Sequence, residues 1–145
     1  KIISSTHIRK LIQKGKLTVA NQFLSRNWSI EGTVEKGRMM GRKIGFPTCN
    51  IDIKNYVIPK VGVYAVDTYV ENKSKKIKGI ANIGYRPTFN QKKLLLEVNL
   101  FKFSGNLYNK KLTINFTKFI RGEKKFKNID ALKKQIKKDI IIAKR

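Results

Sequence analysis

From Trp28 onward, the pattern of hydrophobic and polar positions is that of β-strands. Side chains of a strand point alternately to its two faces, so short runs with a period of two predict strands buried on one side. The predicted strands are Trp28–Lys36, Thr48–Ile53, Val61–Val70, Lys76–Gly84, Leu94–Lys102 and Lys111–Ile120. They follow one another without an intervening helical pattern, which indicates an antiparallel arrangement.

The first residues have a helical pattern instead. Ser4-Ser5-Thr6 can cap a helix over His7–Lys14, and Gly15 can end it. Thr18 can cap a second helix over Val19–Ser25. Neither helix is long enough to be stable alone.

The tail from Asn128 onward predicts a longer helix, because apolar residues recur at spacings of three and four. These residues are Ile129, Leu132, Ile136, Ile140 and Ala143. We expect their face to pack against the sheet. The opposite face carries Lys133, Lys134, Lys137 and Lys138 and is expected to be solvated.

Turn residues between the strands favour closure of the sheet into a barrel. Glu71-Asn72-Lys73-Ser74 and Ser104-Gly105-Asn106 have the composition of hairpin turns. A closed antiparallel barrel then satisfies every strand edge. The connections that do not look like simple turns are Gly37–Phe46, Tyr85–Lys92 and Arg121–Lys127, and such loops usually carry the function of a barrel.

The composition fits one folded domain. The chain has 145 residues, of which 41% are hydrophobic and 10% aromatic. A lone Cys49 excludes an internal disulfide and a cysteine-based zinc site and fits a reducing compartment, so we expect a cytoplasmic protein. No apolar run reaches the length of a membrane span, and no membrane association is expected. Because the chain starts at Lys1, we expect a piece of a longer protein.

The net charge of +24 is the signal most open to another interpretation. So positive a chain attracts polyanions, and a basic barrel that binds single-stranded nucleic acid through lysines and exposed aromatics such as Trp28, Tyr69 or Tyr85 is one alternative. However, the basic residues comprise 26 Lys and 7 Arg and are scattered along the chain. This pattern favours a solvated surface, and nucleic acid is not the expected partner.

A glycine-rich segment with several cations lies between the first two predicted strands. Backbone N–H groups and the side chains of such a segment can approach phosphates. Its glycines are Gly32, Gly37, Gly41 and Gly45, and its cations are Lys36, Arg38, Arg42 and Lys43. Gly32 and Gly37 have the glycine spacing of a Walker A loop, but Arg38-Met39 follow where Lys and Ser/Thr are needed, and no dinucleotide-binding fingerprint occurs. On glycines alone, an ordinary mobile hairpin is the favoured interpretation.

The next segment is Gly45-Phe46-Pro47-Thr48-Cys49-Asn50. Pro47 fixes the backbone before a strand, and alternation then places Thr48 and Asn50 on one side with Cys49 on the other. A hydroxyl and an amide are neutral oxygen donors that can ligate Mg²⁺ and bind a phosphate. The structural alternative is that both side chains satisfy backbone groups at the start of the strand.

Glu97 is the carboxylate best placed for catalysis, because it lies within the mostly apolar segment Leu94–Leu100. A base that accepts a hydroxyl proton during phosphoryl transfer suits that position. A solvent-facing glutamate on an alternating strand is the alternative. His7 is the only histidine, so a site that needs two histidines is excluded, and we interpret His7 as structural.

Taken in order, six segments resemble the riboflavin kinase family, the kinase half of bacterial bifunctional riboflavin kinase/FMN adenylyltransferases. The segments are Gly41–Asn50, Gly62–Ala65, Ala81–Phe89, Leu96–Val98, Leu107-Tyr108 and Arg121–Phe126. The resemblance implies a six-stranded Greek-key barrel that transfers phosphate from ATP to riboflavin. One departure is Cys49, where the family usually has alanine; little effect is expected, because its side chain should face away from Thr48 and Asn50.

The resemblance also implies roles for individual residues. The glycine-rich loop with Gly41, Arg42, Lys43 and Gly45 covers the nucleotide. Thr48 and Asn50 bind Mg²⁺ and the ATP phosphates, and Glu97 is the catalytic base. The loop with Arg121, Glu123 and Phe126 closes over the flavin. A flavin-binding module without turnover remains a further alternative.

The start of the chain is similar to the closing motif of the adenylyltransferase half. That segment is Ile3–Arg9, with His7 where the motif usually has arginine. We therefore expect residues 1–27 to be a helical linker and remnant of a preceding, covalently linked adenylyltransferase domain, and residues 28–145 to be the kinase domain. The phosphate-binding His-x-Gly-His signature of the adenylyltransferase domain needs two histidines. This chain has one, so it is not expected to form FAD.

Overall fold

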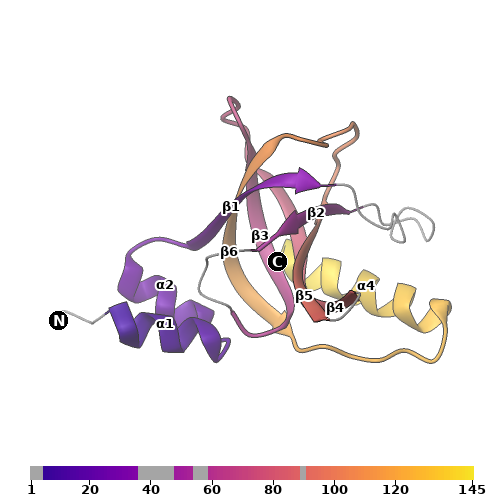
Figure 1. The fold of residues 1–145 in the computed structure, drawn as a ribbon, viewed down its shortest axis with the longest axis horizontal. Coiled ribbons are helices and arrows are strands. Elements are labelled where there is room, and N and C mark those ends of the chain that lie inside the picture. The colour runs from indigo at the N-terminus through magenta and orange to yellow at the C-terminus, as the bar shows by residue number, and fades with distance from the viewer. Residues whose placement is uncertain (1–4, 36–47, 54–58, 89–90) are drawn as a thin grey trace.

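The computed structural model describes residues 5–35, 48–53, 59–88 and 91–145, which form a barrel with helices on its outside (Figure 1). The elements are α1 (Ser5–Gln13), α2 (Leu17–Leu24), β1 (Trp28–Glu35), β2 (Cys49–Asp52), β3 (Gly62–Val70), β4 (Ile77–Thr88), β5 (Gln91–Leu100), β6 (Lys111–Arg121) and α4 (Ile129–Lys144). Each predicted strand and helix has a counterpart among them.

The strands form a closed antiparallel barrel in the order β1-β2-β5-β4-β3-β6, with β6 returning to pair with β1. Strands β3, β4 and β5 follow one another as neighbours, and β6 returns beside β3. This is a Greek key, so the expected fold class is confirmed. The turn at Glu71 joins the paired strands β3 and β4, as predicted.

The segment around Ser104-Gly105-Asn106 does not join a hairpin, because β5 pairs with β2 and β4 whereas β6 pairs with β1 and β3. That part of the prediction was wrong. Turn residues specify a local reversal of the chain but not the strand beside which the next one is placed.

Strands β4 and β5 also extend beyond their predicted bounds. The ladder continues from Gly84 to the pair Thr88 and Gln91, so most of the connection expected over Tyr85–Lys92 is strand. Pairing of β4 with β3 ends at Ile83, which leaves the extension as an edge. Proline is tolerated at the edge of a sheet. Pro87 therefore lies within β4, and the loop predicted from it is strand.

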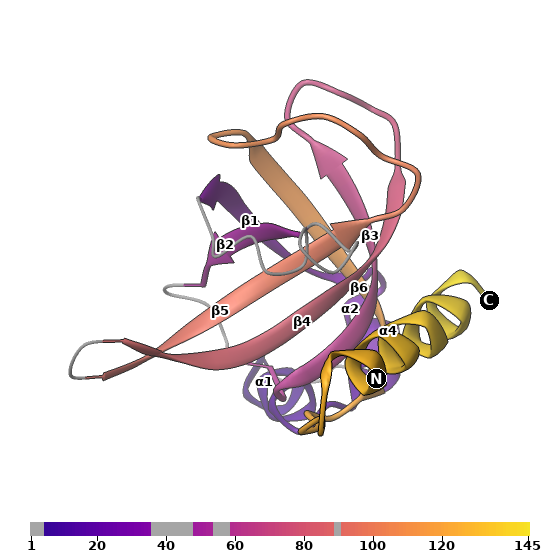
Figure 2. The same cartoon turned by 90° about the vertical axis from the view of Figure 1, so that its right-hand side faces the viewer.

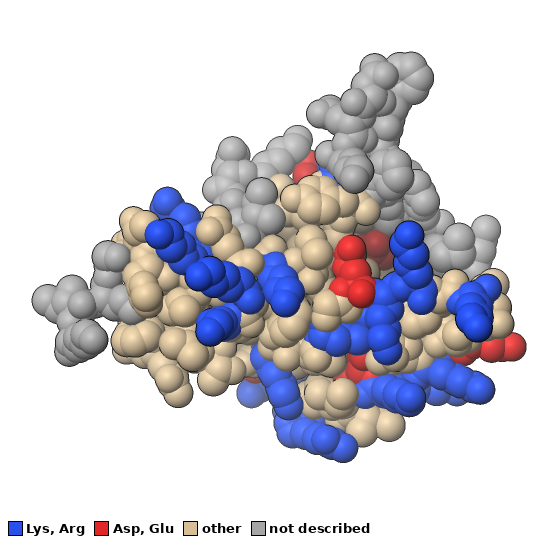
Figure 3. Space-filling model, turned by 90° about the horizontal axis from the view of Figure 1, so that it is seen from below, with Lys and Arg blue, Asp and Glu red and all other residues tan. Residues whose placement is uncertain are grey.

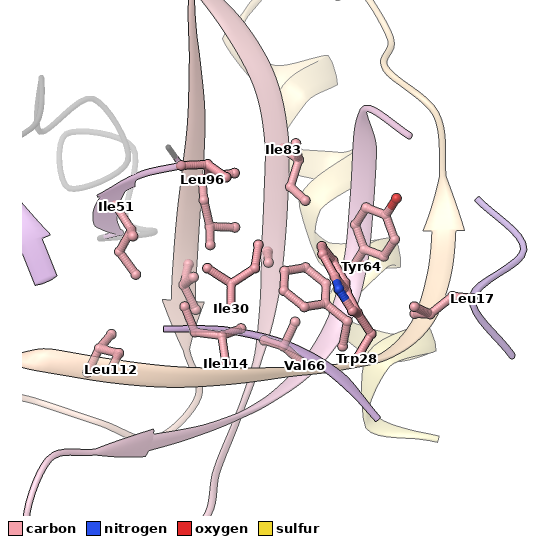
Figure 4. Packing of buried hydrophobic residues seen from close by; sticks show 14 of the residues in the cluster. Leu17, Trp28, Ile30, Ile51, Tyr64, Val66, Ile83, Leu96, Leu112 and Ile114 are labelled. Atoms are coloured by element: carbon pink, nitrogen blue, oxygen red, sulfur yellow. The ribbon is translucent and has the colours of Figure 1, made fainter. Parts of the chain in front are cut away.

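The barrel interior is filled by one face of every strand. Figure 4 shows residues of different strands pointing toward one another, among them Ile30, Ile51, Ile83, Leu96 and Ile114, each with at most a trace of exposed surface. Aromatic rings close the end near the N-terminal helices, where Phe116 packs against Trp28 and Tyr64 with ring centroids 5.0 and 5.2 Å apart. Burial raises the pKa of the Tyr64 hydroxyl, which donates a hydrogen bond to the Lys60 carbonyl.

Helices α1 and α2 lie against the same end and share the core. Ile12, Leu17 and Ala20 are buried in the same cluster as the barrel interior. The Asn21 amide donates to the Phe116 carbonyl at 2.9 Å, and its oxygen accepts from the Trp28 backbone N–H at 2.8 Å. Gly15 ends α1 with a φ of +78°, as predicted.

Helix α2 begins at Leu17, and no side chain caps it. The prediction of an N-cap at Thr18 was therefore wrong. Packing of Leu17 into the core sets the start of this helix, and tertiary burial outweighs the local capping preference.

Helix α4 packs on the outside of β3, β4 and β6 (Figure 2). Asn128 caps it by accepting a hydrogen bond from the Ala131 N–H at 2.9 Å. Leu132, Ile136, Ile140 and Ala143 are half-buried, but Ile129 is 56% exposed, so the predicted face packs only in part. The buried residue of this helix is Asp139, which the hydrophobic pattern did not indicate.

Candidate active site

Three polar residues lie side by side across the neighbouring strands β2, β5 and β4. Asn50 is paired with Glu97, and Glu97 is paired with Asn82. Their neighbours in the chain include the core residues Ile51, Leu96 and Ile83. Because side chains alternate along a strand, Asn50, Glu97 and Asn82 face the outside of the barrel.

Thr48 directly precedes β2, two residues before Asn50, and its side chain lies beside the same polar residues. Its hydroxyl donates a long hydrogen bond of 3.4 Å to Glu97 Oε2. Both side chains are partly buried. The structure therefore brings together Thr48, Asn50 and Glu97, which the sequence had singled out separately.

Asn50 has an uncommon environment for a side-chain amide. It is only 6% exposed, and its Oδ1 has no hydrogen-bond partner among the described residues. A buried acceptor without a donor is costly, so native structures usually supply a partner or reserve such an atom for a ligand. An amide oxygen is also a ligand that Mg²⁺ accepts.

Cys49 lies on the opposite face, as expected. It is paired with the core residue Val98, packs against the core, and burial raises the pKa of its thiol. The thiol is thus turned away from the group formed by Thr48, Asn50 and Glu97.

Asn82, the partner of Glu97 on β4, is not among the site residues predicted from the sequence. A usable signal existed, because Asn82 is a polar residue between the buried residues Ala81 and Ile83. Beside this row, the Lys93 ammonium lies 3.7 Å from Glu35 and 3.5 Å from Asp52. The pair with Glu35 is exposed and is expected to contribute little to stability. The Asp52 carboxylate is only 12% exposed, and both pairs place a cation beside this row.

Arg121, at the end of β6, is held by helix α4. Its Nε and Nη2 donate to the Asp139 carboxylate at 3.0 and 2.9 Å, and its Nη1 donates to the Gly122 carbonyl at 3.0 Å. The Gln135 amide completes the set by donating to Asp139 at 3.0 Å. Sequence reasoning placed Arg121 in the flavin loop but missed Asp139 as its partner.

The segment after Arg121 passes close to the candidate site. Gly62 has a φ of +147°, and a Cβ there would lie 2.3 Å from the Arg121 carbonyl oxygen, so β3 and this segment touch through their backbones. A Cβ at Gly84 would lie 2.6 Å from Glu123 Oε1, which places the Glu123 carboxylate over β4. Gly84 is two residues beyond Asn82, so it lies on the same outer face.

Phe126 lies nearby, with the Arg121 guanidinium 5.8 Å from the centre of its ring. Two of the residues predicted to close over a flavin, Arg121 and Phe126, are thus adjacent, whereas the third, Glu123, lies over β4 at Gly84. Gly41, Arg42, Lys43 and Gly45, predicted to bind the nucleotide, lie outside the described residues.

Charge and hydropathy add two observations about the surface. On the face in Figure 3, Lys and Arg side chains are spread from the side of α1 and α2 to the opposite side, and no single stripe gathers them. Among the described helices, none is long and apolar enough to cross a membrane.

A family model described as "Flavokinase: Riboflavin kinase" matches residues 24–145. Two curated relatives carry the name bifunctional riboflavin kinase/FMN adenylyltransferase. The protein from Bacillus subtilis is 43% identical over 96% of this chain and 45% of its own length. The protein from Haemophilus influenzae is 46% identical over 98% of this chain and 46% of its own length. The chain thus spans about half the length of these relatives.

Two solved structures share the fold. A chain from Streptococcus pneumoniae described as a macrolide-efflux protein is 32% identical, with a TM-score of 0.91 over 99% of this chain and 47% of that one. Riboflavin kinase from Trypanosoma brucei is 23% identical, with a TM-score of 0.58 over 80% of this chain and 76% of that one. The efflux description belongs to the first protein alone, whereas the family model and both curated relatives name riboflavin kinase.

Proposed function

The chain belongs to the riboflavin kinase family, and we propose that it transfers the γ-phosphoryl group of ATP to the ribityl 5′-hydroxyl of riboflavin, which yields FMN and ADP. The observation that carries this proposal is the outward row of Asn50 and Glu97 with Thr48 bonded to it. It supplies a carboxylate and neutral oxygens side by side within the part of the chain that matches the family.

Glu97 is the proposed catalytic base. Its carboxylate would accept the proton of the 5′-hydroxyl while the oxygen forms a bond to the γ-phosphorus and the bond to the leaving ADP oxygen breaks. The Thr48 hydroxyl donates to one oxygen of this carboxylate at 3.4 Å and helps to orient it. Pairing of β5 with both β2 and β4 holds the backbone of Glu97 in place.

Thr48 and Asn50 fit a divalent cation bound together with ATP. The buried Asn50 Oδ1 lacks a partner among the described residues, and neutral oxygens suit Mg²⁺. No cluster of three or more His, Cys, Asp or Glu side chains that could hold a metal occurs in the described part of the chain, so the remaining ligands would come from ATP phosphates and water. When bound, Mg²⁺ would neutralise charge on the phosphates.

The segment that follows β6 is the proposed flavin side of the site. Glu123 and Phe126 are proposed to contact riboflavin, since Glu123 lies over Gly84 on the outer face. Arg121 is proposed to orient this segment, because its donors are directed to Asp139 and to the Gly122 carbonyl. A role in nucleotide binding for Gly41, Arg42, Lys43 and Gly45 stays a prediction.

We further propose that residues 1–27 link this domain to an adenylyltransferase domain in a longer protein, as the bifunctional relatives suggest. FAD formation would then belong to that other domain. A cytoplasmic location stays a prediction that rests on the lone Cys49.

The test is incubation of the purified chain with riboflavin and Mg-ATP, followed by chromatography for FMN. We expect one FMN for each ADP, and no FMN in a control without ATP. Absence of FMN with every divalent metal tried, despite riboflavin binding, would favour a flavin-binding module without turnover.

A further inference from the structure

A cavity of about 670 Å³ lies at the end of the barrel where the turn after β3, the start of β4 and the segment after β5 meet. Both views of the fold show these connections at the same, upper end (Figures 1 and 2). The last turn of α4 contributes one wall. The lining residues are Val70, Lys73, Lys75, Lys76, Ile77, Lys78, Phe101, Lys102, Phe103, Leu107 and Lys144.

The positive charge of the six lysines in this lining is hardly compensated by nearby carboxylates of the described residues. Lys76 lies 4.0 Å from Asp67, and within the described residues no other lysine of the lining forms an ion pair with a carboxylate. All nine Asp and Glu side chains of the sequence belong to the described residues. The mutual repulsion of the ammonium groups would be relieved by an anion, and lysine is a common point-charge partner of phosphate.

The rest of the lining is apolar and partly aromatic. Phe103 is 37% exposed although it faces a cavity, and the Lys144 ammonium lies 5.2 Å from the centre of the Phe101 ring. An exposed phenyl group such as that of Phe103 offers a stacking surface for a planar ring. The volume falls within the usual range for small-molecule sites, about 300–1,000 Å³. A concave site with apolar walls of this size favours a small ligand with a planar ring.

The cavity is separate from the candidate active site. Phe101 lies four residues beyond Glu97, about 13 Å along the chain at 3.3 Å per residue. Its backbone N–H donates to the Lys78 carbonyl at 2.8 Å, which extends the β4 and β5 pairing to the rim of the cavity. Glu123, in contrast, contacts β4 at Gly84, toward the other end of that strand.

We propose that this cavity binds a small aromatic phosphate, with the lysines holding the phosphate and the phenylalanines holding the ring. This proposal does not rest on the kinase activity. The probe is 1-naphthyl phosphate, titrated into the whole chain by calorimetry at fixed ionic strength. Inorganic phosphate and 1-naphthol serve as the separate halves of the probe.

The first variant changes Lys78→Gln, Lys102→Gln and Lys144→Gln together. A matched control changes Lys134→Gln, Lys137→Gln and Lys138→Gln, which removes the same charge from the exposed face of α4. The probe should bind the parent more tightly than either half, and the first variant should lose about tenfold in affinity or more while the control stays within about twofold. FMN formation in the first variant should remain at the parental rate.

A second variant, Phe103→Ala, keeps every charge and should weaken binding of 1-naphthyl phosphate but not of inorganic phosphate. Equal losses in the cavity and control lysine variants would overturn the proposal, because net charge alone would then explain binding. So would binding of an oligothymidylate through the cavity lysines without binding of the probe, since the partner would then be a nucleic acid.

Discussion

At the scale of single residues, Asn50 and Glu97 owe their proximity to a pairing between strands that are not consecutive. Alternation along β2 was enough to predict that Thr48 and Asn50 share a side and that Cys49 points away. No local pattern gave the register that sets Asn50 opposite Glu97. Only the resemblance to the kinase family predicted that Asn50 and Glu97 belong to one site. It gave no role to Asn82, which the strand register places beside Glu97.

Replacement of Asn50 by alanine tests the proposed contact with Mg-ATP. Because the amide is proposed to bind the cation and phosphates, the KM for Mg-ATP should rise by about tenfold or more, the equivalent of one hydrogen bond to a charged group. The KM for riboflavin should stay near the parental value. Steady-state kinetics with each substrate varied in turn measures both KM values. A rise confined to the KM for riboflavin would contradict the proposed contact of Asn50 with Mg-ATP.

At the scale of elements, α4 differs most from its predicted role. Its apolar spacing correctly predicted a helix against the barrel, but Ile129 is exposed and the most deeply buried residue is Asp139. The reason is an interaction distant in sequence, because the Arg121 guanidinium needs a carboxylate where β6 ends. Local periodicity cannot show which helical position faces a charged partner on a strand.

The Arg121 and Asp139 pair should couple stability to the proposed flavin side of the site. The Asp139 side chain is 1% exposed and that of Arg121 is 18% exposed, so Asp139→Ala leaves a poorly solvated cation. We expect the free energy of unfolding to fall by about 3–5 kcal/mol, the range for breaking a buried pair. Urea unfolding measures this loss.

A double variant separates positioning from stability. Arg121→Met combined with Asp139→Leu removes both charges and should regain much of the lost stability. If Arg121 orients the segment after β6, the double variant should still have a raised KM for riboflavin and an unchanged KM for Mg-ATP. Parental kinetics in a stable double variant would show that Arg121 has a structural role only.

At the scale of the whole molecule, α1 and α2 belong to the same folded unit as the barrel. The sequence predicted both helices and the closed antiparallel barrel, because turn and strand signals are local. It did not predict that the segment after β5 crosses to another part of the barrel, nor that β4 and β5 continue past Gly84. Both features depend on which strands become neighbours.

Leu17 tests whether the helices stabilise the barrel. It is 2% exposed within the core, so Leu17→Ala should lower the free energy of unfolding by about 2–4 kcal/mol in a single transition. Val19→Ala, at a position of the same helix that is 40% exposed, should change it by about 0.5 kcal/mol or less. A barrel transition unchanged by Leu17→Ala would mean that the helices fold as a separate unit.

The most direct test of the proposed kinase activity is the rate of FMN formation from riboflavin and Mg-ATP by the chain and by its Glu97→Gln variant. Glu31→Gln is the matched control, because Glu31 is an exposed glutamate on β1 whose carboxylate lies 3.1 Å from the Lys111 ammonium. Loss of the base should lower kcat by about 100-fold or more with both substrates still bound, whereas the control should keep the parental rate. Parental turnover in Glu97→Gln, or no FMN from the parent chain, would contradict the proposed site.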